Sequence, residues 1–101
     1  MNTLTGAQFT DEGLTGWSFL ADGIQTRLRT GDFASGMALL CRIGEAAEEM
    51  NHHPDLDLRY TYLDVRLTSH DAGGVTSRDV MLARRIGELA ADAEVGLDPG
   101  V

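Results

Sequence analysis

The chain has 101 residues, 43% of them hydrophobic, and its 16 acidic and 8 basic side chains give a net charge of −8. This length fits one domain, spanning residues 1–101, with a single hydrophobic core. No apolar run approaches the roughly 20 residues that cross a bilayer, which argues against a membrane protein. The acidic balance argues against direct binding to nucleic acid, because phosphate backbones attract basic surfaces.

Cys41 is the only cysteine, so an internal disulfide cannot form. The first residues show no basic region followed by an apolar stretch, which is the pattern of a secretory signal. Both observations favour a reducing compartment, and we expect a cytoplasmic protein.

The first 16 residues are rich in glycine and threonine and show little periodicity. Asp11, Glu12 and Leu14 fit a short helix, but the glycines around them disfavour it. A short apolar run over 17–20 then precedes an Asp-Gly turn, and residues 24–29 alternate apolar and polar side chains. This pattern predicts a β-hairpin that follows at most a short first helix.

A long helix is expected over 34–50, with Asp32 as its N-cap. Its apolar residues occupy two stripes, which together are broader than one face of a sheet requires. A broad apolar surface of this kind favours a homo-oligomer, a homodimer or homotetramer. A helix that lies deep within its own core is the alternative.

Pro54 ends the helical region, because the residue before a proline favours an extended backbone. Apolar residues then alternate at even positions from 56 to 60 and at odd positions from 63 onward. A single strand cannot change phase in this way without a turn or a bulge, so we expect two strands, over 56–60 and 63–69. A glycine-containing loop follows at 71–74.

A last helix is predicted over 77–93, and a frayed tail over 94–101. Together these elements predict an α+β domain with its core at about 14–93. It contains a four-stranded antiparallel sheet and up to three helices packed on one face, in the order α-β-β-α-β-β-α with an uncertain first helix.

The three histidines are the most informative residues for function: His52 and His53 are adjacent, and His70 ends the last predicted strand. Histidine exchanges protons near neutral pH and also binds metals. The sequence lacks His-Glu-x-x-His and Cys-x-x-Cys, and adjacent histidines chelate one ion less readily than spaced ones, which disfavours a metal site. Proton-transfer chemistry and a purely structural role remain open.

Other polar residues can support these histidines. Glu48 lies four residues before His52, so a helix that continued this far would stack the two side chains. Asp79 fits the capping box of the last helix, with Thr76 as its N-cap. Trp17 is either a core residue or the wall of a pocket.

The ordered set of these residues resembles the pterin-4a-carbinolamine dehydratase family. The resemblance is carried by Glu48 followed by His52-His53-Pro54, then by Tyr60, His70 and Asp79, and by the segment 71–76. Gly16-Trp17 and Gly31-Asp32-Phe33 also match family landmarks. The chain departs from the family pattern at Leu56, where many members carry tryptophan, and at Ser69, where threonine is commoner.

The resemblance implies dehydration of 4a-hydroxytetrahydropterin to quinonoid dihydropterin in tetrahydropterin recycling, without a metal or other cofactor. It implies that His52 and His70 act as acid and base and that His53 orients the pterin. Glu48 would then set the electrostatics of His52, Ser69 and Asp79 would support the His70 side, and Trp17 would line the pocket. The alternatives are a non-catalytic interaction module of the same fold, which acts as a dimerisation cofactor or assembly factor, and a metal-binding domain.

Overall fold

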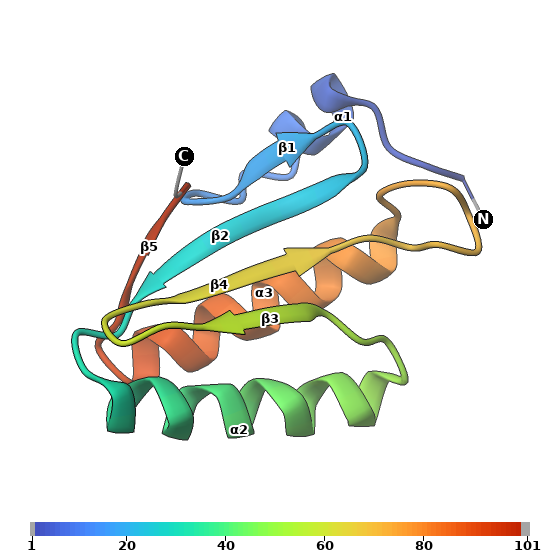
Figure 1. Ribbon diagram of the computed structural model, residues 1–101. Helices are drawn as coiled ribbons and strands as arrows, with labels where there is room; N and C mark the ends of the chain where they lie inside the picture. Colours follow the sequence, from blue (N-terminus) through green and yellow to red (C-terminus); the bar gives the residue numbers. More distant parts are fainter. Residues whose placement is uncertain (1, 100–101) are drawn as a thin grey trace.

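Two antiparallel hairpins form the sheet of this protein (Figure 1). In the computed structural model, which describes residues 2–99, β1 (Ser18–Leu20) pairs with β2 (Gly23–Arg29), and β3 (Asp55–Leu58) pairs with β4 (Leu63–Leu67). Pairing of β2 with β4 joins the hairpins in the order β1-β2-β4-β3. The short fifth strand β5 (Gly96–Asp98) pairs with the part of β2 that β1 leaves open.

Three helices, α1 (Gly6–Asp11), α2 (Phe33–Met50) and α3 (Ser77–Asp92), complete the α+β architecture. The two long helices lie side by side across one face of the sheet (Figure 1). Asp32 caps α2 by accepting a 2.8 Å hydrogen bond from the Ser35 N–H. The predicted fold class and order of elements are therefore confirmed, and β5 is added to them.

The first helix forms although glycines surround it. Thr5 and Gln8 build a capping box, in which each side chain bonds the backbone N–H of the other residue. The ring of Phe9 then lies 5.6 Å from the ring of Phe19, between centroids. Phe19 pairs with Ile24 on the inner face of the sheet, so α1 packs on the same face as the two long helices.

The second hairpin is shorter than predicted at both strands. β3 ends at Leu58, and the Arg59 N–H donates 2.8 Å to the carbonyl of Tyr62 to close the turn. Tyr60 is 76% exposed, so the apparent continuation of the alternation to this residue was wrong. The predicted change of phase does coincide with the turn between the two strands.

The predicted frayed tail over 94–101 is corrected at Gly96–Asp98, where the chain forms β5. Leu97 pairs with Leu28 of β2 and packs against the core. A strand of three residues has too little periodicity to be read from sequence, and it forms here because β1 stops short and leaves the edge of β2 unpaired. Residues 100 and 101 lie outside the described part of the chain.

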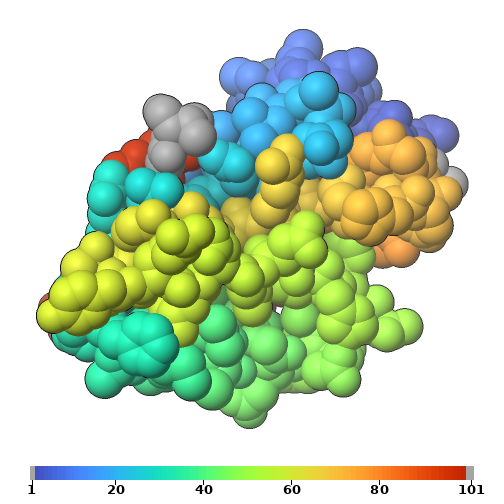
Figure 2. Space-filling view, viewed as in Figure 1, coloured from blue at the N-terminus to red at the C-terminus, as the bar shows by residue number. Residues whose placement is uncertain are grey.

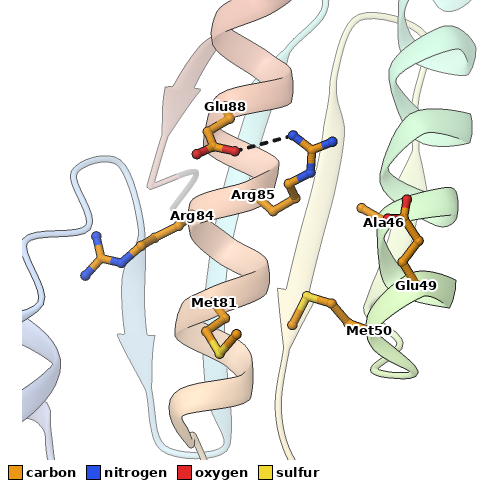
Figure 3. A pocket seen from close by; sticks show the side chains of 7 residues that line it. All are labelled: Ala46, Glu49, Met50, Met81, Arg84, Arg85 and Glu88. Atoms are coloured by element: carbon orange, nitrogen blue, oxygen red, sulfur yellow. Dashed lines mark hydrogen bonds and ion pairs between the residues drawn. The ribbon is translucent and has the colours of Figure 1, made fainter.

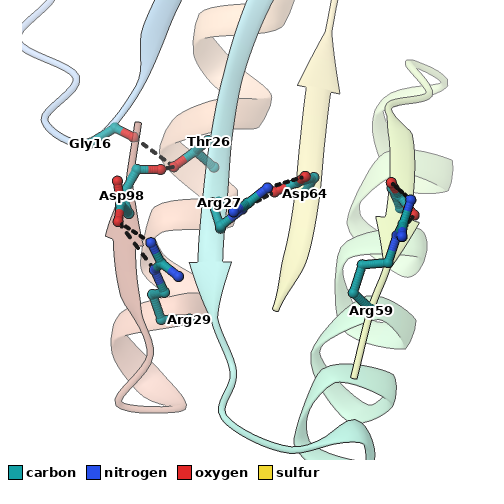
Figure 4. Close-up of polar contacts among 8 residues, drawn as sticks. Gly16, Thr26, Arg27, Arg29, Arg59, Asp64 and Asp98 are labelled. Atoms are coloured by element: carbon teal, nitrogen blue, oxygen red, sulfur yellow. Dashed lines mark hydrogen bonds and ion pairs between the residues drawn. The ribbon is translucent and has the colours of Figure 1, made fainter. Parts of the chain in front are cut away.

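The two faces of the sheet differ in chemistry. The inner face carries fully buried apolar side chains, and these meet Leu39 and Ile43 of α2 and Leu82 and Ile86 of α3. The outer face carries charged pairs, among them Arg27 with Asp64, drawn in Figure 4. Within residues 2–99, no helix combines the length and apolar character that a membrane span needs.

Candidate functional site

The candidate site lies at the end of the sheet where α2 ends, β4 ends and α3 begins. The end of α2 is distant in sequence from the start of α3, and the three segments lie at the same end of the molecule (Figure 1). The C-cap of α2 is Asn51, whose left-handed backbone (φ 50°) turns the chain sharply away from the helix axis. His52 and His53 follow this turn directly, so neither continues the helix.

A buried hydrogen-bond network joins His52 to the start of α3. His52 Nε2 lies 2.6 Å from Asp79 Oδ1, and Asp79 is fully buried. The other carboxylate oxygen of Asp79 accepts 2.8 Å from the Ser69 hydroxyl and 2.9 Å from the Thr76 N–H. Since the one proton of Ser69 goes to Asp79, the Thr76 hydroxyl donates the 2.8 Å bond to Ser69 Oγ.

This network fixes the tautomer of His52. An ionised carboxylate only accepts hydrogen bonds, so His52 holds a proton at Nε2 and donates it to Asp79. The other ring nitrogen, Nδ1, has no hydrogen-bond partner among residues 2–99. It is also not one of the fully buried polar atoms of that region that lack a partner. Nδ1 is therefore the nitrogen of His52 that this network leaves without a hydrogen-bond partner.

The structure changes the predicted partner of Glu48. Its carboxylate contacts His53 Nε2 instead of stacking on His52. The predicted i, i+4 contact required the helix to continue, but α2 ends at Met50. Both side chains of the Glu48–His53 pair are more than half exposed, in contrast to the buried His52. Likewise, Asp79 and Ser69 bond to the His52 side, although we expected them to support His70.

His70 lies in an open hollow on the outer side of the sheet. It follows Ser69 directly, and because successive side chains of an extended chain point to opposite sides, Ser69 is buried while His70 is exposed. The hollow has a volume of about 350 Å³. Its walls come from the turn between β1 and β2, the end of β4 and the loop after β4, and Figure 2 shows these segments meeting on the face toward the viewer.

Charged residues that we did not single out from the sequence line this hollow with His70. They are Arg66 and Asp55, on neighbouring positions of β4 and β3, and Asp22 in the turn between β1 and β2. Arg66 and Asp22 form an ion pair. The period of a strand could have indicated Arg66, because residues 66, 68 and 70 fall on one side of an extended chain.

The loop after β4 carries a second ion pair beside the site. Arg78 donates 2.6 Å to Asp71 Oδ1, next to His70 in sequence. This hydrogen bond holds the pKa of Asp71 below its ordinary value and raises the pKa of Arg78. Gly73, in the same loop, has a φ of 79°, a conformation that side chains disfavour.

Trp17 belongs to the core. It is 8% exposed, and the hollow that it lines includes Phe9 and Leu14. No hydrogen bond joins Trp17 to a histidine in the described part of the chain, and the hollow beside His70 does not include Trp17. The core interpretation of Trp17 therefore fits the structure, and its predicted place in the pterin pocket does not follow from these contacts.

A second hollow of about 380 Å³ lies between α2 and α3, where Figure 3 shows Met50 and Met81 with the Arg85–Glu88 pair. It contains no histidine, so it lacks a side chain that titrates near neutral pH at its ordinary pKa. From residue 2 to residue 99, no three histidine, cysteine or acidic side chains are grouped to hold a metal ion. The hollow beside His70 is therefore the better candidate for acid–base chemistry.

Comparisons with known proteins find one family whose sequence model matches most of this chain. Residues 2–89 match the sequence model of the family described as Pterin 4 alpha carbinolamine dehydratase. A protein of Burkholderia cenocepacia whose name places it in that family is 44% identical over 87 residues, which cover 84% of this chain and 85% of the relative. A second such protein, of Thermomicrobium roseum, is 41% identical over 78 residues, which cover 77% and 84%.

A solved structure is similar as well. The crystal structure described as transcriptional coactivator/pterin dehydratase from Brucella melitensis aligns with a TM-score of 0.82 at 28% identity. The alignment covers 88% of this chain and 99% of the other. The likeness in sequence and the likeness in fold therefore point to the same family.

Proposed function

Because this chain belongs to the pterin-4a-carbinolamine dehydratase family, we propose that it removes water from 4a-hydroxytetrahydropterin by histidine acid–base catalysis. The members compared above carry the name of a hydro-lyase. The observation that carries the mechanism is that Ser69, bonded to the buried His52–Asp79 pair, directly precedes His70 in its open hollow.

The reaction needs one acid and one base. The bond between C4a and the hydroxyl oxygen breaks, and an acid supplies the proton that makes the departing group water. A base takes the proton from N5, and the electron pair of that N–H bond forms the C4a=N5 double bond of the quinonoid product. Histidine serves both steps near pH 7, where each well-placed group contributes roughly 10²–10⁴-fold.

We propose a division of roles among the histidines. His52 is held by Asp79 in one tautomer and offers Nδ1, while His70 is exposed in the hollow. We assign the acid–base pair to these two residues. We assign the binding and orientation of the pterin to His53, which is exposed and paired with Glu48. We leave open which of the pair is acid and which is base, because coupled groups titrate together.

Rates of dehydration measured with purified variants test this proposal. His52→Ala and His70→Ala should each lower kcat/KM by roughly 10²-fold or more. Glu88→Gln, in the exposed pair of the α2–α3 hollow, is the matched control and should keep the wild-type rate. A wild-type protein that is no faster than buffer would contradict the function, and full activity in both histidine variants would contradict the mechanism.

A second candidate is a partner-binding role, and one support for it is that the similar Brucella melitensis protein is described as a transcriptional coactivator. The other is the surface of α2, where Phe33 is 50% exposed and Met37 is 41% exposed. The same surface supports association with further copies of the chain as a homodimer or homotetramer. Co-purification of a stoichiometric partner with both wild type and His52→Ala would favour the partner-binding role. Sedimentation of Met37→Glu beside wild type tests whether copies of the chain associate through this surface.

A further inference from the structure

Arg66 donates fewer side-chain hydrogen bonds than the other arginines in the strands and in the turn after β3. Arg27, Arg29 and Arg59 each donate from two nitrogens to one carboxylate, as Figure 4 shows. Arg66 donates from one nitrogen to one oxygen of Asp22, and no other side-chain partner holds it among the residues that the structure describes. Its remaining N–H groups, and the second oxygen of Asp22, are therefore available to a ligand.

Arg66 and Asp22 are held by the β-sheet and by a tight turn, and both lie beside His70. Arg66 lies in β4, between Gln25 of β2 and Asp55 of β3 in the ladder. Asp22 lies in a two-residue turn, because Leu20 pairs directly with Gly23. Both line the hollow of about 350 Å³ that contains His70, a volume at the lower end of the range for small-molecule sites, roughly 300–1,000 Å³.

The chemistry of the pair complements one edge of a pterin. Along its pyrimidinone ring, the 2-amino group and N3–H are adjacent donors, and the carbonyl oxygen O4 is the next group and an acceptor. A carboxylate accepts two parallel hydrogen bonds, and a guanidinium donates to a carbonyl from its planar fork. An Asp–Arg pair held side by side therefore presents acceptors and a donor in the order that this edge requires.

We propose that Asp22 and Arg66 bind the pyrimidinone edge of the pterin, with Asp22 accepting from the 2-amino group and N3–H, and Arg66 donating to O4. This inference rests on the proposed function. The carbon that carries O4 is bonded to C4a, so an anchor at O4 brings the departing hydroxyl close to the wall of the hollow that His70 forms. The two residues select substrates with a 2-amino-4-oxo ring and act in binding.

The test uses the whole chain and separates binding from chemistry. Asp22→Asn and Arg66→Gln should each raise KM, and the dissociation constant for a reduced pterin, by about tenfold to a hundredfold, the loss of charge-assisted hydrogen bonds. The value of kcat should stay within a few-fold of wild type. Folding should be preserved, because an exposed ion pair contributes little to stability.

Asp57→Asn and Arg59→Gln are the matched controls, since they alter an exposed ion pair outside the hollow and should leave KM unchanged.

A reduced lumazine, with a 2-oxo group in place of the amino group, should bind wild type more weakly than the pterin does, and Asp22→Asn should reduce that difference. Unchanged KM in both Asp22→Asn and Arg66→Gln, with active wild type, overturns this inference alone. Wild type that neither binds the pterin nor dehydrates it overturns the proposed function as well.

Discussion

The imidazole of His52 lies 2.6 Å from the carboxylate of Asp79, although 27 positions separate the two residues in sequence. Asp79 is also the third residue of α3 and bonds to the N-cap Thr76. One buried carboxylate therefore both begins a helix and orients a candidate catalytic ring. Changes at Asp79 should affect stability and activity together.

Replacing Asp79 with asparagine tests this double role. The Ser69 hydroxyl, the Thr76 N–H and His52 Nε2–H all donate to the carboxylate, and an amide nitrogen in its place would face a donor. We expect Asp79→Asn to lower the free energy of unfolding by about 1–3 kcal/mol and kcat by roughly 10²-fold. Ser69→Ala, which removes one donor and keeps the carboxylate, should lose much less activity. Chemical denaturation and steady-state rates measure the two effects, and equal kcat in both variants would contradict the assignment.

The hydroxyl of Thr26 in β2 contacts both the segment before β1 and strand β5. It donates 2.6 Å to the carbonyl of Gly16, just before β1, and lies 3.3 Å from the carbonyl of Asp98 in β5 (Figure 4). Thr26→Val keeps the shape of this buried side chain but removes the donor, so we expect a loss of about 1–3 kcal/mol in urea unfolding. Thr10→Val makes the same chemical change at an exposed threonine and should change stability by less than about 0.5 kcal/mol. Equal losses of stability in Thr26→Val and Thr10→Val would contradict the proposed contribution of the Thr26 hydrogen bond.

Two glycines should respond in opposite ways to alanine. A Cβ atom at Gly23 would lie 2.6 Å from the backbone oxygen of Leu67, which cannot move without disturbing the β2–β4 ladder. We expect Gly23→Ala to destabilise the protein by about 1–3 kcal/mol. At Gly87, inside α3, a Cβ meets nothing within 4 Å, so Gly87→Ala should stabilise by about 0.5–1 kcal/mol. Thermal unfolding of both variants beside wild type checks the two signs.

The cap of α2 should make stability depend on acidity. Hydrogen bonds from Ser35, first from its backbone N–H and then from its hydroxyl, lower the pKa of Asp32 below the ordinary 3.8. A carboxyl with a lowered pKa in the folded state stabilises the fold above its unfolded value. That contribution is lost as the pH falls below 3.8 and through the lower pKa that Asp32 has in the folded state.

The variant Asp32→Asn isolates this contribution. An asparagine at the N-cap still accepts the hydrogen bond from the helix but cannot titrate. Asp32→Asn should therefore show a smaller loss of stability than wild type between about pH 6 and pH 3 in denaturant titrations. An identical loss in the two proteins would contradict this account of the cap.

The elements and their order could be predicted from the sequence, because the periods of strands and helices are local. Alternation over residues 24–29 and the change of phase between residues 60 and 63 indicated the strands of both hairpins, and Asp32 and Thr76 marked the starts of the long helices. The three histidines could also be singled out as candidates from the sequence, but Asp22, Asp55 and Arg66, which line the hollow with His70, were not.

Which of these residues meet depended on the packing of the whole chain. The turn at Asn51 directs Glu48 to His53 and leaves His52 to Asp79. Pairing of β2 with β4 brings Asp22 next to Arg66, 44 positions away. The edge of β2 that β1 leaves open pairs with β5. Such contacts depend on how segments that are far apart in sequence pack together. The residues around one position do not specify which distant residue will contact it.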